Sequence, residues 1–156
     1  MSEEVEKVKQ YLCAWGLSER VREFTVSSAT VELAARAVGV IPARIAKTLS
    51  FRSGEGCILL VAAGDRRVDN HKFKAEFGMK AAMLAPEDAL RLTGHAVGGV
   101  CPFALPDGAD VYLDVSLQRF ATVFPAAGSS SSAAEMSCEE LFRASRAKKW
   151  VDVCKE

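Results

Sequence analysis

The first apolar residues of the chain recur at spacings of three and four positions. The series consists of Val5, Val8, Leu12 and Trp15, and Gly16 follows it directly. A helix places residues at this spacing on one face, and glycine is common just after the last turn. The pattern therefore predicts an amphipathic helix that ends at Gly16.

Four more helices are predicted from residues that favour a helix start. Serine, threonine, asparagine and aspartate can accept a hydrogen bond from the first helical turn, and proline has the backbone angle of a first helical residue. The expected starts are Thr30, Asp69 or Asn70, Pro86 and Ser137. The first two helices are expected to end at Val38 and Phe77, each followed by glycine. Glu140, three positions after Ser137, completes the spacing of a capping box.

Short apolar runs alternate with these helices and are predicted to be strands. Residues 57–63 are apolar throughout, so we expect this strand to be buried on both faces. Residues 47–51 precede it across a glycine-containing turn, which predicts a hairpin. Short strands are also expected at residues 21–26, 111–115 and 121–124 and after the serine run 129–132, and residues 79–84 form a second short apolar run. Roughly five to seven strands mixed with about five helices indicate a single α+β domain over residues 1–156.

Composition narrows the class of protein. The chain has 156 residues, which suits one domain, and 49% hydrophobic with 26% charged residues is typical of a globular protein. Equal numbers of basic and acidic residues, 20 each, argue against a protein that coats long nucleic acid, but allow a local basic patch. The acidic start is unlike a signal peptide and no apolar run could span a bilayer, so we expect a cytoplasmic protein without membrane contact. The five cysteines include no Cys-x-x-Cys pair, so we expect neither disulfides nor a metal site.

Two features carry candidate chemistry. The loop Gly98, Gly99, Val100, Cys101 and Pro102 can turn main-chain N–H groups toward an electron-rich carbonyl or a phosphate. Before it in the chain, Lys47 places one cation in an otherwise apolar segment. From the residues alone, an ordinary surface turn is the favoured interpretation of the loop, and the lysine could equally extend to solvent with no further role.

The order of several motifs resembles the YbaK-like family, also called the prolyl-tRNA-synthetase-associated editing domain. The matching segments are Ile-Ala-Lys-Thr-Leu at 45–49, Ala-Ala-Gly-Asp at 62–65, Val-Asp-Asn-His-Lys-Phe at 68–73, the glycine-rich run 94–103, and Val-Tyr-Leu-Asp at 111–114. The resemblance covers roughly residues 20–145. It implies a mixed, partly closed sheet of about six or seven strands flanked by helices. Members of this family remove a wrong amino acid from tRNA, and the lack of synthetase-sized flanking sequence implies a free-standing protein.

The resemblance implies a trans-editing hydrolase that deacylates mischarged aminoacyl-tRNA. Its substrate would be the acceptor end of a tRNA, tRNA-Pro being one candidate, that carries a small amino acid such as alanine, cysteine or serine. The Gly98–Pro102 loop would stabilise the oxyanion while water or a ribose hydroxyl assists hydrolysis, and Lys47 would hold the terminal phosphate or ribose. No cofactor or metal is expected, and an aminoacyl-tRNA synthetase is a candidate partner.

Seven further residues are candidates for substrate binding. Thr48 follows the lysine in the motif, and Val97 and Phe103 are expected in the pocket wall beside the glycine loop. His71 and Lys72 lie on a helix expected to be exposed, where a basic group could contact tRNA or form a solvated face. Gly128 and Ser129 correspond to a small-residue loop beside the pocket in the family.

Two other functions remain open from the sequence. A protein of the same fold could bind tRNA or a nucleotide without hydrolysing it. Alternatively, Cys101 could be the nucleophile of an unrelated thiol hydrolase, which would require a base, and His71 and His95 are the only histidines. Replacing Lys47 should abolish editing and spare a thiol hydrolase, whereas replacing Cys101 should do the reverse.

Overall fold

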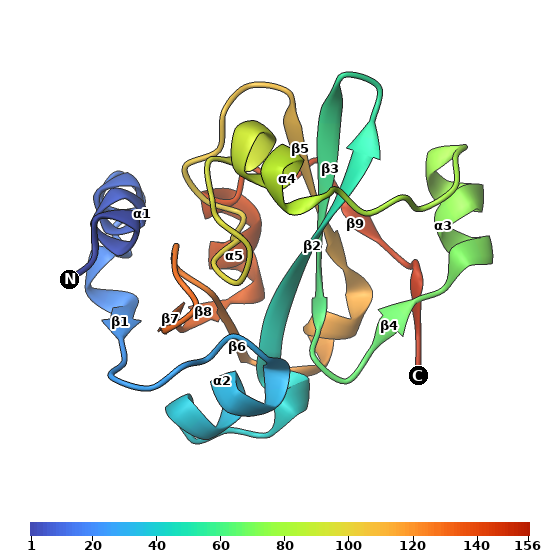
Figure 1. Ribbon diagram of the computed structural model, residues 1–156. Helices are drawn as coiled ribbons and strands as arrows, with labels where there is room; N and C mark the ends of the chain where they lie inside the picture. Colours follow the sequence, from blue (N-terminus) through green and yellow to red (C-terminus); the bar gives the residue numbers. More distant parts are fainter.

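The computed structural model describes residues 1–156 as one α+β domain, in which five α-helices surround a mixed sheet (Figure 1). The helices are α1 (Glu3–Cys13), α2 (Val31–Val38), α3 (Asn70–Phe77), α4 (Pro86–Thr93) and α5 (Cys138–Ala144). Three single 3-10 turns lie at Ser18–Arg20, Pro42–Arg44 and Val115–Arg119. None of the helices is long and apolar enough to cross a membrane.

The main sheet has six strands in the order β8-β6-β2-β3-β5-β9 and curls into a half-barrel, which confirms the expected mixed, partly closed sheet. Its strands are β2 (Ile45–Ser53), β3 (Gly56–Ala63), β5 (Ala109–Asp114), β6 (Thr122–Pro125), β8 (Met136–Ser137) and β9 (Trp150–Val151). Two separate pairs join β1 (Val21–Glu23) to β7 (Ser132–Ala134) and β4 (Arg67–Val68) to β10 (Cys154–Lys155).

The β2–β3 hairpin runs through the middle of the molecule (Figure 1). Alternate side chains of β3 enter two different clusters, so Leu59 and Val61 pack with α1 and α5, whereas Leu60 and Ala62 pack with α3 and the C-terminal segment. A third, smaller cluster joins Ile45 of β2 to α2 and β6. The prediction that the apolar strand at residues 57–63, which is β3, is buried on both faces is confirmed.

The predicted helix starts at Thr30, Asp69 and Ser137 are confirmed by side-chain hydrogen bonds at their caps, whereas α4 begins at Pro86 as predicted but without such a bond. The hydroxyl of Thr30 accepts from the N–H of Leu33, and the carboxylate of Asp69 accepts from two N–H groups of α3. Ser137 and Glu140 form the complete capping box at α5, each side chain accepting from the other's N–H. These local bonds fix where α2, α3 and α5 begin, independently of the packing that follows.

Several short elements differ from the sequence predictions. Trp15 lies beyond the end of α1, and β1 covers only Val21–Glu23 of the expected run. The apolar run 79–84 forms no strand and pairs with β2 only through one bridge, between Met83 and Phe51. The two-residue strands β4, β9 and β10 were not predicted, because pairing with residues distant in the chain creates them rather than any pattern of their own.

We expect Ser137→Ala to lower the free energy of unfolding by about 1 kcal/mol, because the substitution leaves the Glu140 N–H without its cap. Chemical denaturation followed by circular dichroism measures the effect. Glu139→Gln is the matched control on the same helical turn, since Glu139 is exposed, and should stay within about 0.5 kcal/mol of the wild type. Equal stabilities for Ser137→Ala and the wild type would contradict the assigned capping role.

Candidate functional site

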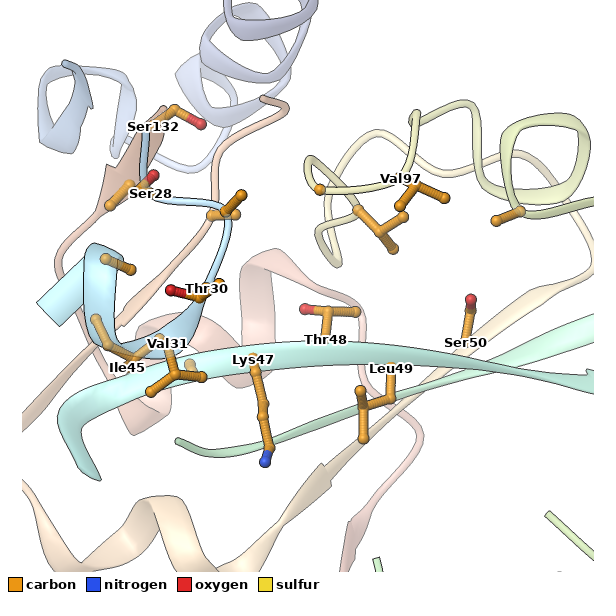
Figure 2. A pocket seen from close by; sticks show the side chains of 18 of the residues that line it. Ser28, Thr30, Val31, Ile45, Lys47, Thr48, Leu49, Ser50, Val97 and Ser132 are labelled. Carbon is orange, nitrogen blue, oxygen red and sulfur yellow. The ribbon is translucent and has the colours of Figure 1, made fainter. Parts of the chain in front are cut away.

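A cavity of about 410 Å³ lies between β2 and the loop that carries Val97 (Figure 2). Its volume is in the range of small-molecule sites in proteins. Fourteen of its 22 lining residues are hydrophobic, so the cavity suits a small, largely apolar group with a few polar anchors. The walls come from the segment 28–34, from β2, from residues 83–89, from the glycine loop and from the segments around Phe124, Ala126 and Ser132.

The glycine loop packs directly on the main chain of the serine run. A Cβ atom added to Gly99 would lie 2.7 Å from the carbonyl oxygen of Gly128 and 2.8 Å from the Cα of Ser129. Gly98 has a φ of +91°, and a Cβ there would lie 3.2 Å from the Cβ of Ser130. Both positions therefore need glycine, Gly99 for close approach and Gly98 for its backbone conformation. This contact brings together the two loops that the sequence proposed as neighbours of one pocket.

The serine run is an ordered loop with many internal hydrogen bonds. The hydroxyl of the buried Ser132 accepts from the N–H groups of Ala127 and Ser129 at 3.1 Å each and donates to the carbonyl of Ser129 at 3.0 Å. Ser28 donates its N–H and its hydroxyl to the carbonyl of Ser130, at 2.6 and 3.0 Å. The segment before α2 is thereby fastened to the loop, and both border the cavity.

Three of the four N–H groups of the glycine loop, those of Gly98, Val100 and Cys101, have no hydrogen-bond partner in the chain. The N–H of Gly99 donates to the carbonyl of Ala96 at 2.9 Å, which closes the turn, whereas those of Gly98 and Val100 make no internal bond. Gly98 and Val100 border the cavity. Free main-chain donors in a cavity wall are suited to bind a carbonyl oxygen or an oxyanion.

His95 connects the two ends of the glycine loop from inside the core. Its Nε2 lies 2.8 Å from the carbonyl oxygen of Phe103, and because a carbonyl oxygen only accepts, Nε2 carries the proton and donates. Burial lowers the pKa of this imidazole, against a smaller opposing effect of the bond to Phe103, so the ring stays neutral. His95 is therefore placed to hold the loop in shape rather than to transfer protons in the cavity.

Cys101 belongs to the glycine loop and is fully buried. Its Sγ is 3.5 Å from the Nε2 of His95, but that nitrogen already carries a proton and so is not a base for the thiol. Burial raises the pKa of the Cys101 thiol to about 12, which keeps it protonated and poorly nucleophilic. Cys101 and Phe103 pack in the core and do not border the cavity.

Lys47 borders the cavity on the other side of the strand from Thr48 and Ser50 (Figure 2). Its side chain points away from the loop that carries Val97, and its ammonium donates to the carbonyl oxygen of Arg66. Lys47 therefore contributes to the lining, but its ammonium lies on the opposite side of β2 from Thr48 and the glycine loop.

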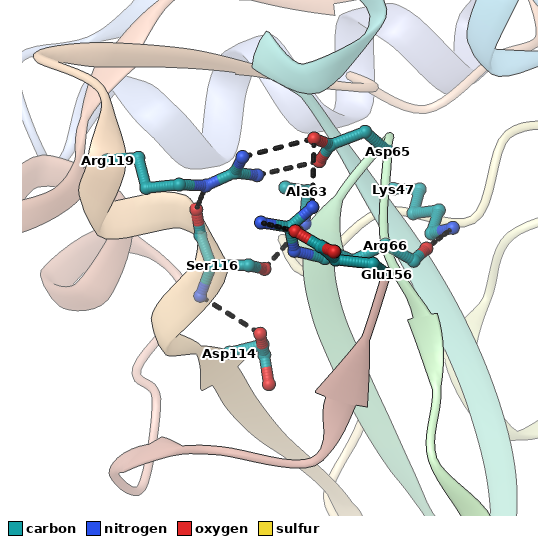
Figure 3. Close-up of polar contacts among 8 residues, drawn as sticks. All are labelled: Lys47, Ala63, Asp65, Arg66, Asp114, Ser116, Arg119 and Glu156. Atoms are coloured by element: carbon teal, nitrogen blue, oxygen red, sulfur yellow. Dashed lines mark hydrogen bonds and ion pairs between the residues drawn. The ribbon is translucent and has the colours of Figure 1, made fainter.

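The turn that supplies this carbonyl is held by ion pairs (Figure 3). The guanidinium of Arg119 donates to both carboxylate oxygens of Asp65, at 3.0 and 2.6 Å, and this bond holds the pKa of the Asp65 carboxyl below its usual value. Arg66 contacts Asp65 at 3.2 Å and Glu156 at 3.8 Å. The position of the Lys47 ammonium thus depends on a network between β3 and the turn after β5.

The structure brings together some of the predicted site residues and separates others. Those that border the cavity are Lys47, Thr48, Val97, Gly98 and Val100. Gly99, Gly128 and Ser129 support this wall from behind, and Pro102 borders a different, polar cavity of about 220 Å³. His71 and Lys72 lie on α3, away from the lining, where the ammonium of Lys72 contacts Asp152 and the carbonyl of Cys154.

Sequence reasoning missed the lining contributed by residues 28–34 and 83–89, and by Ser50 and Ser132. Ser50 and Ser132 are buried serines in strands β2 and β7, and a serine beside apolar strand residues was the available signal. Thr48 also stands out, because its Oγ1 is the only buried side-chain nitrogen or oxygen without a hydrogen-bond partner. Its side chain points toward the loop that carries Val97 (Figure 2).

Comparison with known proteins assigns the family. The family model for the aminoacyl-tRNA editing domain matches residues 25–144. "Uncharacterized protein YwhH" of Bacillus subtilis (strain 168) is 52% identical over 153 residues, which are 97% of this chain and 98% of that protein. A "Proline--tRNA ligase" of Thermosipho melanesiensis is 32% identical over 88 residues, or 56% of this chain and 16% of the ligase. A crystal structure described as "a putative trans-editing enzyme for prolyl tRNA synthetase" matches with a TM-score of 0.91 at 29% identity, over 100% of this chain and 99% of that one.

The chain is therefore a single-domain α+β protein of the translation-editing class. It belongs to the aminoacyl-tRNA editing domain family, which confirms the resemblance drawn from the sequence motifs. The likeness in fold extends over the whole chain, whereas the likeness to proline–tRNA ligases is confined to a small part of those enzymes.

We expect Gly99→Ala to destabilise the protein by about 1–3 kcal/mol, because the new methyl group would overlap main-chain atoms of Gly128 and Ser129 that cannot rotate away. Urea denaturation measures the change. Ala96→Ser is the control in the same loop, since Ala96 is exposed, and it should leave stability unaltered. Wild-type stability of Gly99→Ala would mean that the two loops are not held in contact.

Stability should also fall as the pH drops below about 6.5, the ordinary pKa of histidine. The lowered pKa of His95 means that the unfolded chain takes up a proton that the folded protein does not bind, so protonation favours unfolding. Denaturation curves between pH 7.5 and 5 measure the effect at roughly constant ionic strength. His95→Gln should flatten this dependence, whereas the exposed His71→Gln should keep it. A dependence that survives in His95→Gln would exclude His95 as its source.

Proposed function

We propose that this protein is a cytoplasmic trans-editing hydrolase that removes a small amino acid from the acceptor end of a mischarged tRNA. The observation that carries the proposal is the cavity of about 410 Å³ whose wall contains the unpartnered N–H groups of Gly98 and Val100. Its support comes from the membership of the chain in the aminoacyl-tRNA editing domain family. The amino acid would enter the cavity while the tRNA stays outside.

The chemistry needs positioning more than a strong nucleophile. An aminoacyl-tRNA is an ester, and its hydrolysis builds negative charge on the carbonyl oxygen as water attacks. Donors fixed in a cavity wall stabilise that charge, and the loss of one such donor typically costs about 3–4 kcal/mol of barrier. Gly98 and Val100 would supply these donors, and water, with or without the neighbouring ribose hydroxyl, would be the nucleophile.

Lys47 would bind the end of the tRNA at the edge of the cavity. In the free protein its ammonium donates to the carbonyl of Arg66, and an ammonium on a flexible stem can exchange such a neutral acceptor for a phosphate or ribose oxygen. A charged acceptor forms the stronger hydrogen bond. Lys47 would therefore contribute to binding and orientation of the ester rather than to proton transfer.

Cavity size and lining favour small side chains as substrates. A hydrophobic pocket separates amino acids that differ by one methylene by only about 1–3 kcal/mol, which is why charging errors need a second hydrolytic step. Alanine, cysteine and serine are the amino acids to test. The relative named proline–tRNA ligase and the structure described as an enzyme for prolyl tRNA synthetase make tRNA-Pro the first acceptor to test.

We expect the wild type to release at least one of alanine, cysteine and serine from mischarged tRNA-Pro, and Lys47→Ala to lower kcat/KM by about 10-fold to 100-fold. The reason is the loss of a charge-assisted hydrogen bond to the tRNA. Release of labelled amino acid measures the rate, and Lys9→Ala on α1 is the control for a general loss of charge, because Lys9 does not border the cavity. If the folded protein released no amino acid from any mischarged tRNA, the proposal would be wrong.

Cys101→Ala separates this reaction from the thiol hydrolase considered from the sequence. Because the buried Cys101 thiol does not border the cavity, the variant should keep its kcat within a few-fold of the wild type after correction for stability. A complete loss of turnover in folded Cys101→Ala would favour the thiol mechanism. Tight binding of tRNA without turnover by the wild type would favour the binding-protein alternative.

A further inference from the structure

The outer edge of β2 is left unpaired at one position. On this side β2 pairs with β6 at Ile45 and Ala46, where the pairing stops. Hydrogen bonds resume at Ser50, whose carbonyl accepts from the N–H of Leu84 at 3.1 Å, and continue at Arg52, whose N–H donates to Ala82 at 2.8 Å.

Thr48 is the residue whose main chain faces this gap. Successive residues of a strand direct their N–H and C=O groups to opposite edges, so residues two apart direct them to the same edge. Since Ser50 and Arg52 bond outward to the segment 82–84, Thr48 also presents its N–H and carbonyl outward, away from β3. No bond from another segment reaches them there.

The sequence explains why no segment pairs with β2 at Thr48. Two residues after Leu84, where the next donor of this segment would lie, the chain has Pro86, which carries no N–H. Pro86 and Thr48 both border the cavity, as does Gly98 on the facing loop. The hydroxyl of Thr48 is itself without a partner, so one residue contributes three unsatisfied polar groups to a largely apolar space. Groups of this kind are costly to leave unpaired, which points to a polar ligand.

We infer that the Thr48 edge binds the α-ammonium group of the aminoacyl ester. This inference rests on the proposed function and adds a subsite to it. The Thr48 carbonyl and hydroxyl oxygens accept hydrogen bonds from the ammonium, while the N–H groups of Gly98 and Val100 receive the ester oxygen from the facing wall. The two groups are on adjacent carbon atoms of the amino acid, which matches a cavity with acceptors on one wall and donors on the other.

The subsite makes a free amino group a requirement for the substrate. Acylation of the α-nitrogen removes its positive charge and adds bulk at a gap that is one residue long. The protein would then spare tRNAs that carry a formylated or peptidyl amino acid, whatever the side chain. Discrimination of this kind is separate from selection by side-chain size, because it depends on main-chain groups of β2.

The test uses a stable substrate mimic, in which an amide replaces the ester: 3′-(L-alanylamino)-3′-deoxyadenosine. It is compared with two analogues, one with an N-acetyl group and one in which propionyl replaces alanyl, so that the ammonium is absent. Titration calorimetry gives the affinities, and ¹H–¹⁵N spectra of the labelled full chain follow the Thr48 amide. We expect the ammonium compound to bind at least ~10-fold more tightly than either analogue, as for a hydrogen bond to a charged group, and to shift the Thr48 signal.

A matched pair of variants tests the hydroxyl. Thr48→Val removes it at nearly constant shape and should weaken binding of the ammonium compound severalfold, whereas Thr48→Ser should restore most of the affinity. Equal affinity for all three compounds, or no binding of the ammonium compound, would overturn the inference. Hydrolysis of mischarged tRNA without a preference for the free ammonium would also overturn it and leave the proposed function intact. Ammonium-dependent binding without hydrolysis would support the subsite and remove the proposed function.

Discussion

The antiparallel pairing of β2 with β3 supports every other part of the molecule. Eight consecutive residue pairs, from Ala46 opposite Ala63 to Ser53 opposite Gly56, form one ladder. The parallel strands β6 and β5 attach to its two outer edges, and hydrophobic clusters cover both of its faces. Because β2 is hydrogen-bonded to β3 along one edge, it can remain in position even where a main-chain group on its other edge has no hydrogen-bond partner.

The candidate site is made of main-chain groups more than of reactive side chains. The groups with familiar catalytic chemistry, His95 and Cys101, are buried, and both are held in their neutral forms. The cavity is instead bordered by Gly98, Val100 and Thr48, whose main-chain groups have no hydrogen-bond partner in the chain. Such groups depend on geometry alone, so the closeness of Gly99 to the serine run matters for chemistry as well as stability. Neutral, fixed dipoles suit an ester that hydrolyses readily once it is oriented.

Local signals in the sequence predicted the fold better than the site. Caps such as Thr30 and Ser137 and the β2–β3 hairpin follow from neighbouring residues, and the structure has them where expected. The strands of the C-terminal segment could not be predicted, since Cys154 pairs with Val68 across most of the chain. For the site, the motifs located Lys47 and the glycine loop. They could not show which side chains of β2 point toward the cavity, because that depends on how β2 pairs with its neighbouring strands. The contribution of residues 28–34 depends on their attachment to the serine run, which no local pattern encodes.

Pro86 also bears on the solubility of the folded protein. Unpaired strand edges are templates on which other chains can add a strand and aggregate. Here the open stretch of β2 is bounded by pairing at Ala46 and again at Ser50, and the loop that carries Val97 faces it. A foreign strand would find only one residue to pair with, too few to compensate for the entropy of ordering it. The main-chain groups of Thr48 can thus form hydrogen bonds with a small molecule, whereas another polypeptide strand could not pair stably with this edge.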